Sequence, residues 1–109
     1  MAAPNSIDEL LDLYPEYFNP AEAEGVDGIV QLDLSGEDGG QYVLTIRNQE
    51  LDVQEGTHED PTVAIKTTAE RWLQINRGEA NPMMLMMTGR LSIDGSLSMA
   101  TKFQSLFDV

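Results

Sequence analysis

Gly28-Ile29-Val30-Gln31-Leu32-Asp33-Leu34-Ser35-Gly36 is the stretch that decides the fold of this 109-residue chain. The apolar side chains at positions 30, 32 and 34 alternate with polar ones at 31 and 33. This period of two is typical of a strand that has one buried and one solvated face. The glycines and acids that follow, up to Gly40, predict a tight turn. A sheet therefore begins at this point of the chain.

Three further alternating stretches follow the first one. Their apolar positions are Tyr42, Leu44 and Ile46, then Leu51 and Val53, then Val63, Ile65 and Thr67. Asn48-Gln49 predicts a tight reversal, and residues 56–61 form a polar loop. Four strands in a row with short connections predict an antiparallel meander with one solvated face. Leu91 and Ile93 predict a fifth strand that ends at Gly95.

Helical spacing flanks the sheet on its N-terminal side. Ser6 and Glu9 have the spacing of a capping box, and apolar residues follow at positions 7, 10, 11 and 14. We expect this helix to end soon after Pro15. Asn19 as cap and Pro20 as first residue predict a short second helix over residues 20–24.

Two more helices are predicted around the fifth strand. Thr67 and Glu70 offer a capping box for a helix whose stripe includes Trp72, and Gly78 fits its C-terminal cap. Ser96 opens the final helix. One face of that helix carries Met99, Ala100, Phe103, Leu106 and Phe107.

The other unusual stretch is Met83-Met84-Leu85-Met86-Met87, which follows Asn81-Pro82 and precedes Gly89. It predicts a helix of about two turns that has no polar face, and such a helix must be buried or must face an apolar partner. Methionine is unbranched and polarizable, so clustered methionines form a surface that adapts to what it touches. Two interpretations stay open, since these residues either fill a small core or line a cavity for a lipid.

Length and composition predict one domain over residues 1–109 with a single core. The sequence has no apolar run of 18 residues and no visible secretory signal. Because it also has no cysteine, disulfides, thiolate catalysis and cysteine-zinc sites are excluded. We expect a cytoplasmic protein.

Charge is distributed unevenly in this acidic protein. Residues 1–60 carry a net charge of −14, whereas residues 61–109 carry +1. Nucleic acid would be repelled by the first half and only weakly attracted by the second, so we expect no nucleic-acid partner. Contact with a membrane would be transient at most and would use the second half, where the methionines are.

No residue pattern indicates catalysis or metal binding. His58 is the only histidine, and neither a second histidine nor a G-x-S-x-G serine completes a triad. The glycine-rich turn at residues 35–40 precedes no helix, so it is no phosphate cradle. Asp94 is the acid nearest the apolar helix, and capping of the last helix is its simpler interpretation. We therefore expect no catalytic residue, no metal, no cofactor and no enzyme activity.

Three segments resemble the sterol carrier protein type 2 (non-specific lipid-transfer) domain family over nearly the whole chain. They are residues 28–36, then Gly78-Glu79-Ala80-Asn81-Pro82-Met83, then Met87-Thr88-Gly89-Arg90-Leu91-Ser92-Ile93-Asp94-Gly95-Ser96. Here Arg90 stands in place of the usual lysine, Asp94 replaces a residue that is often basic, and Ser96 replaces the usual acid or amide.

The resemblance implies an α+β fold in which a five-stranded, mostly antiparallel sheet is covered on one face by helices and encloses an apolar tunnel. It implies binding, and possible transfer, of fatty acid, fatty acyl-CoA or a similar lipid without catalysis. We predict as ligand-binding residues Trp72, Met83, Met84, Met86, Met87, Met99, Phe103, Leu106 and Phe107. Arg71, Arg77 and Arg90 are candidates to hold an anionic head group.

Two alternatives to a lipid carrier stay open. The same apolar surface would suit a module that forms a homodimer or docks onto a partner enzyme, so either a monomer or a homodimer is consistent with the sequence. Trp72 and the stripe on the last helix would equally serve as ordinary core. A small enzyme has the least support, because no paired catalytic groups are present.

Overall fold

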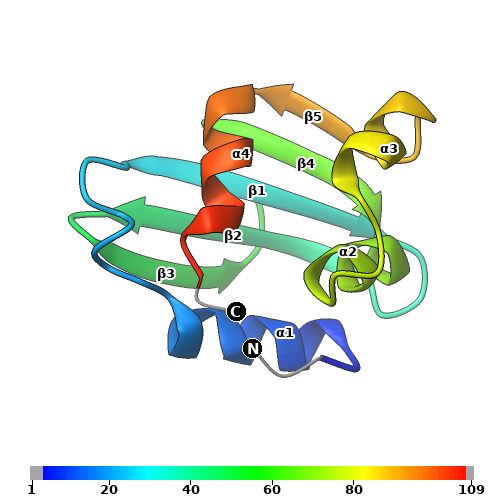
Figure 1. Ribbon diagram of the computed structural model, residues 1–109, viewed down its shortest axis with the longest axis horizontal. Helices are drawn as coiled ribbons and strands as arrows, with labels where there is room; N and C mark the ends of the chain where they lie inside the picture. Colours follow the sequence, from blue (N-terminus) through cyan, green and yellow to red (C-terminus); the bar gives the residue numbers. More distant parts are fainter. Residues whose placement is uncertain (1–3, 108–109) are drawn as a thin grey trace.

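The computed structural model describes residues 4–107 and shows one sheet with helices on one face (Figure 1). The elements of this part of the chain, in order, are α1 (Ile7–Tyr17), β1 (Gly28–Ser35), β2 (Gly40–Arg47), β3 (Glu50–Glu55), β4 (Val63–Thr68), α2 (Ala69–Asn76), α3 (Pro82–Met87), β5 (Ser92–Gly95) and α4 (Leu97–Ser105). The α+β class, the five-stranded sheet and its cover of helices are confirmed.

The strand order is β3-β2-β1-β4-β5, and β1 lies at the centre. β1 and β4 run parallel, while the other three pairs are antiparallel. Leu32 of β1 therefore lies between Tyr42 of β2 and Ile65 of β4. The predicted four-strand meander holds for β1 to β3 only and is wrong for β4, which crosses to the free edge of β1. Apolar alternation shows that a segment is a strand, but it does not specify which edge the strand joins.

The loop of residues 56–62, which crosses from β3 to β4, is held against the outer face of the sheet by Gln31. The side-chain amide of Gln31 donates to the carbonyl of Gly56 at 3.1 Å, and its oxygen accepts from the backbone N–H of His58 at 2.8 Å. Gln31 is buried although its neighbours Val30 and Leu32 point to the helix-covered face. The loop therefore covers part of the face that alternation marks as solvated, and its backbone groups are satisfied by a side chain.

Local hydrogen bonds explain the helix starts. Ser6 Oγ accepts from the N–H of Glu9, and Ser96 Oγ accepts from the N–H of Met99, so Ser96 and not Asp94 caps α4. Thr67 was predicted to cap α2, but Thr68 is the cap, with its hydroxyl accepting from Arg71 N–H. The hydroxyl of Thr67 is buried and donates instead to the carbonyl of Arg90.

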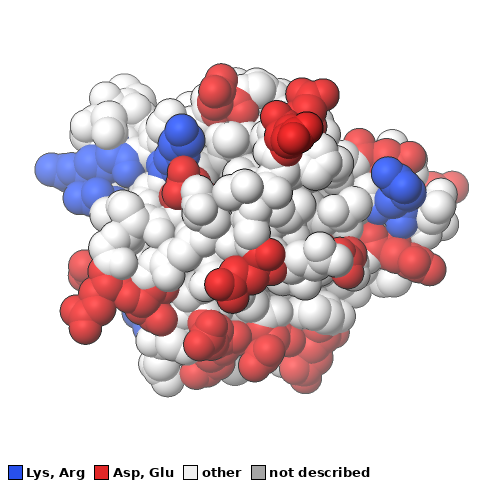
Figure 2. All heavy atoms as spheres, turned by 180° about the vertical axis from the view of Figure 1, so that it is seen from behind, with Lys and Arg blue, Asp and Glu red and all other residues white. Residues whose placement is uncertain are grey.

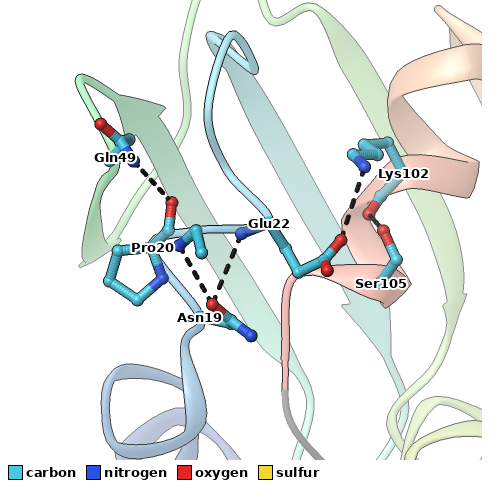
Figure 3. A network of polar contacts seen from close by, with 7 residues as sticks. Asn19, Pro20, Glu22, Gln49, Lys102 and Ser105 are labelled. Atoms are coloured by element: carbon cyan, nitrogen blue, oxygen red, sulfur yellow. Dashed lines mark hydrogen bonds and ion pairs between the residues drawn. The ribbon is translucent and has the colours of Figure 1, made fainter.

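The helix predicted over residues 20–24 is absent, and successive turns replace it (Figure 3). Asn19 does act as a cap, accepting from the N–H of Ala21 and Glu22. However, the carbonyl of Pro20 accepts from the Gln49 side chain, and Gly25 has a positive φ of 74° that ends the segment. These contacts fix turns where propensity alone predicted a helix.

The core lies between the inner face of the sheet and the helices. Its completely buried side chains include Leu10, Tyr14, Val30, Leu32, Leu44, Ile46, Phe103 and Leu106. Phe18, just after α1, forms an isolated bridge with Phe107, so the first helix packs against the end of the described chain. No helix within residues 4–107 is long and apolar enough to cross a membrane.

Acidic side chains are spread over most of the face seen in Figure 2, and basic ones are few. Seen from behind the sheet, the acidic groups are densest along the edge that α1 occupies, and most of the basic groups lie on the side of α2 and α3, with one on the opposite side among acids. The charge asymmetry of the sequence is therefore also an asymmetry of the folded molecule.

Candidate functional site

An apolar groove of about 760 Å³ lies between α3 and α4, where the resemblance implies a tunnel. It is open to solvent, and Ile93 of β5 contributes to its lining. The lining residues are Gly78, Glu79, Ala80, Asn81, Pro82, Met83, Met86, Ile93, Leu97, Ala100, Thr101 and Gln104. Its volume is within the range of small-molecule sites, so one lipid chain is a suitable occupant by size.

Both ends of α3 are fixed by hydrogen bonds, and the predicted cap Asn81 and first residue Pro82 lie where the sequence indicates. Asn81 Oδ1 accepts from the N–H of Met83 at 2.9 Å, and Pro82 is the first helical residue. At the other end the carbonyl of Leu85 accepts from the N–H groups of Arg90 and Leu91 at 2.8 and 3.1 Å. Gly89, at φ 73°, supplies the left-handed residue that lets the chain turn into β5.

The methionines of α3 differ in their environment. Leu85 and Met86 are partly buried and pack on the core. Met83, Met84 and Met87 are 67%, 59% and 80% exposed. Of the methionines that the sequence marks as ligand contacts, only Met83 and Met86 line the groove. For Met84 and Met87, contact with a ligand stays a prediction.

The remaining predicted ligand contacts lie together in the core. Trp72, Met99, Phe103, Leu106 and Phe107 are all at most 8% exposed and none lines the groove. Phe103 stacks with Trp72 at a centroid distance of 6.4 Å and meets the edge of Phe107 at 5.2 Å. The protein itself therefore occupies their surroundings in this conformation. Their contact with a ligand likewise stays a prediction.

Sequence reasoning missed five apolar lining residues, namely Ala80, Pro82, Ile93, Leu97 and Ala100. Leu97 is the clearest of them, because it is 56% exposed and lies outside the buried stripe of α4. The available signal in the sequence was an apolar residue directly after the N-cap Ser96 that does not belong to the apolar face of the last helix. Ile93 belongs to the alternation of the predicted fifth strand, and Ala100 belongs to the apolar face of the last helix. Only the position of α3 shows that both residues also face a groove.

A buried hydrogen-bond network lies beneath the helices. Tyr14 Oη donates to Asn76 Oδ1 at 3.0 Å and accepts from the indole N–H of Trp72 at 3.1 Å. Asn76 in turn donates to the carbonyl of Trp72 at 2.7 Å. Burial raises the pKa of Tyr14 above its ordinary value, while the hydrogen bond from Trp72 opposes this shift. The network joins α1 to α2 and keeps Tyr14 neutral.

The groove carries little charge. Glu79 is the only ionisable side chain among the described residues that line it. The three arginines proposed as head-group partners are not among these residues. Arg77 is closest in sequence, and its Nε donates to the carbonyl of Pro4 at 2.6 Å while its Nη1 lies 3.8 Å from Glu79.

The described residues contain no group of three or more side chains suited to holding a metal ion. Nδ1 of His58 accepts from the backbone N–H of Asp60 at 3.0 Å, so this residue stabilises its own loop. The lining of the groove combines apolar contacts with a few uncharged polar groups. Such a site can hold a hydrocarbon chain and bind one polar head by hydrogen bonds.

Comparison with known proteins gives a consistent picture. A model of the SCP-2 sterol transfer family matches residues 7–108. Hydroxysteroid dehydrogenase-like protein 2 of Rattus norvegicus is 26% identical over 102 residues, which are 93% of this chain and 20% of that protein. The chain thus spans about a fifth of the length of this curated relative.

Two solved structures show the same fold. One is the inverting sec-alkylsulfatase Pisa1 from Pseudomonas sp., with a TM-score of 0.85 and 22% identity, covering 94% of this chain and 16% of that protein. The other is palmitated SCP2L2 from Aedes aegypti, with a TM-score of 0.66 and 17% identity, covering 92% of each chain.

Proposed function

The chain belongs to the SCP-2 sterol transfer family, and from this premise we propose that it is a non-catalytic lipid carrier. The hydrocarbon part of the lipid lies in the groove between α3 and α4. Met83, Met86, Ile93, Leu97 and Ala100 supply the apolar contacts, because these side chains line the groove.

The energetics of apolar burial support this proposal. Burying about 15 methylene groups at about 0.8 kcal/mol each would contribute roughly 12 kcal/mol before the costs of ordering are subtracted. A net value of half this amount, after partial burial and the ordering costs, corresponds to an affinity in the range of tens of micromolar. Polar contacts are therefore not needed for binding, and selectivity among chain lengths would be loose.

The structural neighbours support a long hydrocarbon chain as occupant. The Aedes aegypti protein is described in its palmitated form, so a chain of this fold accommodates a fatty acyl group. The enzymatic names of the rat relative and of Pisa1 belong to proteins that are about five and about six times as long as this chain. We propose that the present chain corresponds to a carrier module, since the described residues that line its groove include no pair of acid and base groups.

A displacement assay with Nile red, a neutral dye, tests the site. The change Met86→Asp places a charge in the groove and should weaken Nile red and hexadecanol binding by at least about tenfold. Met87→Asp separates the two possible sites, because it adds the same charge at an exposed position of α3 outside the groove. Binding in the groove leaves this variant within about twofold of the unchanged protein, whereas the ligand contact predicted for Met87 from the sequence would weaken binding as much as Met86→Asp does. Trp72 emission and circular dichroism verify that both variants are folded.

Two outcomes would contradict the proposal. Equal losses in Met86→Asp and Met87→Asp would place the ligand on the exposed side of α3 and not in the groove. Absence of Nile red, hexadecanol and palmitate binding by the delipidated protein would remove the carrier function itself. Extraction of the purified protein with organic solvent, followed by mass spectrometry, would identify a lipid that it retains.

The exposure of Met83, Met84 and Met87 favours one second candidate, a homodimer that buries α3. Large exposed apolar side chains on one short helix are typical of an interaction surface. Analytical ultracentrifugation over a wide concentration range separates the two candidates. A stable dimer that dissociates in Met84→Asp and Met87→Asp, without any bound lipid, would favour the second.

A further inference from the structure

The charge distribution in and around the groove indicates which head group it accepts. We propose that the groove selects lipids with an uncharged, hydrogen-bonding head, such as a long-chain alcohol, over fatty acids and fatty acyl-CoA. This inference rests on the proposed carrier function and adds a ligand class to the same site.

The first observation is the polar part of the lining. Asn81, Thr101 and Gln104 are uncharged, and Glu79 is the single ionisable side chain among the described lining residues. Asn81 uses its side-chain oxygen on the N–H of Met83, and the hydroxyl of Thr101 donates to the carbonyl of Leu97. The amide of Gln104 offers a donor and an acceptor, and Glu79 accepts hydrogen bonds. A hydroxyl group, which both donates and accepts, matches this set.

The second observation is where the basic side chains of the C-terminal half lie. Arg71 lines a different, polar pocket with Glu37 and Glu70. Arg77 is already in contact with Pro4 and Glu79. Arg90 is exposed beyond α3, and Lys66 is exposed on β4, with Ser92 of β5 as its strand partner. None of them is among the groove residues.

Lys102 is a basic residue that lies beside the groove without lining it. It lines a neighbouring pocket that shares Leu97 and Thr101 with the groove. Its Nζ lies 3.9 Å from Glu22, so it faces the turns of residues 20–25 (Figure 3). An anionic head would reach Lys102 only by leaving the groove across α4 and competing with this carboxylate.

The consequence for an anionic ligand follows from desolvation. In this open groove a carboxylate or phosphate keeps part of its hydration, but the part it gives up against the apolar lining is not replaced, because no basic side chain is among the described lining residues. Glu79 adds repulsion between like charges, and the net charge of −13 opposes the approach of an anion at long range. An alcohol of equal chain length makes the same apolar contacts without these costs.

Competition between ligands of equal chain length tests the proposal. Hexadecanol below its solubility limit, and palmitate and palmitoyl-CoA below their critical micelle concentrations, displace Nile red from the delipidated full chain at pH 7.5. We expect hexadecanol to bind at least about tenfold more tightly than either anion. Equal or tighter binding of palmitate overturns the proposal. Failure of all three to bind, with no Nile red signal, would contradict the carrier function instead.

Charge-reversal variants locate the selectivity. Glu79→Lys should strengthen palmitate binding severalfold and leave hexadecanol within about twofold, because it places a cation in the groove. Glu59→Lys is the matched control, since it makes the same change of net charge in the exposed loop over the outer face of the sheet. A similar gain in palmitate affinity in both variants would show that the gain comes from the net charge of the protein, which contradicts a role of the groove. Loss of palmitate binding in Lys102→Gln would contradict it too, by making Lys102 the head-group partner.

Discussion

The indole N–H of Trp72 donates a buried hydrogen bond to the hydroxyl of Tyr14, with a distance of 3.1 Å between the nitrogen and the oxygen. Residues 58 positions apart in the chain are thereby joined, and the bond fixes α1 against α2. Both rings also contact Phe103 of α4, edge-on for Tyr14 and stacked for Trp72. This group of side chains sets the position of three helices, and so it indirectly sets the position of the groove.

Removal of the Tyr14 hydroxyl tests the importance of this bond. Tyr14→Phe leaves the buried N–H of Trp72 and the Oδ1 of Asn76 without their partner, so we expect a loss of about 1–3 kcal/mol in the free energy of unfolding. Denaturant titration followed by Trp72 emission measures it. Tyr17→Phe, on the same helix but only partly buried, is the control and should change stability by less than about 0.5 kcal/mol. Equal stability of the two variants would contradict the network.

Alkaline pH should destabilise the protein through the same residue. Burial raises the pKa of folded Tyr14 above 10, whereas the unfolded chain titrates near its ordinary value. Below about pH 10 both states hold the proton and stability is unaffected by this group. Above it the unfolded state binds fewer protons, so stability falls by up to about 1.4 kcal/mol per pH unit.

Unfolding at a series of pH values between 8 and 11 measures this slope, and Tyr14→Phe should show a shallower one. Burial, with nearby Asp8, Glu55 and Asp38, also raises the pKa of Tyr42, which adds to the dependence in the same direction. Stability that rises with pH in this range would be inconsistent with a buried neutral Tyr14.

Two glycines with positive φ should respond differently to alanine. At Gly95, where β5 ends, a Cβ would lie 2.6 Å from the carbonyl oxygen of Thr62. At Gly36, in the turn after β1, a Cβ would meet nothing within 4 Å. Gly36→Ala therefore bears only the backbone cost of about 1 kcal/mol, while Gly95→Ala adds a clash and should cost about 2–3 kcal/mol or more. Thermal unfolding of the two variants measures the difference in stability. Equal shifts in Tm would show that β5 moves enough to accommodate the added Cβ at position 95.

The sequence predicted most of the elements because their signals are local. Alternation located the strands, and capping side chains located the starts of α1, α3 and α4 to the residue. The reversal at Asn48 and Gln49 is present, with φ values of 52° and 62° that suit a hairpin turn. The pairing of β4 with β1 was missed, because the bonds that hold its crossing loop come from Gln31, a residue far away in the chain.

The site was harder to predict than the fold. A periodic pattern identifies apolar residues, but it does not distinguish those that touch each other from those that border an opening. Phe103 and Met86 have the same apolar signal in the sequence, yet one is 2% exposed in the core and the other lines the groove. The distinction depends on where α3 sits relative to α4, and this is decided by contacts among several elements.

The bridge between Phe18 and Phe107 has a consequence for the order of assembly. The backbone N–H of Asn19 donates to the carbonyl of Leu106 at 2.7 Å, so the segment after the first helix has its partner at the far end of the described chain. During synthesis on the ribosome α1 emerges early, but it finds this partner only when almost all other residues have been translated. The nascent chain can therefore pack its first helix on β3 and α2 at an earlier stage, but the contacts of Phe18 and Asn19 form only when translation of the domain is nearly complete.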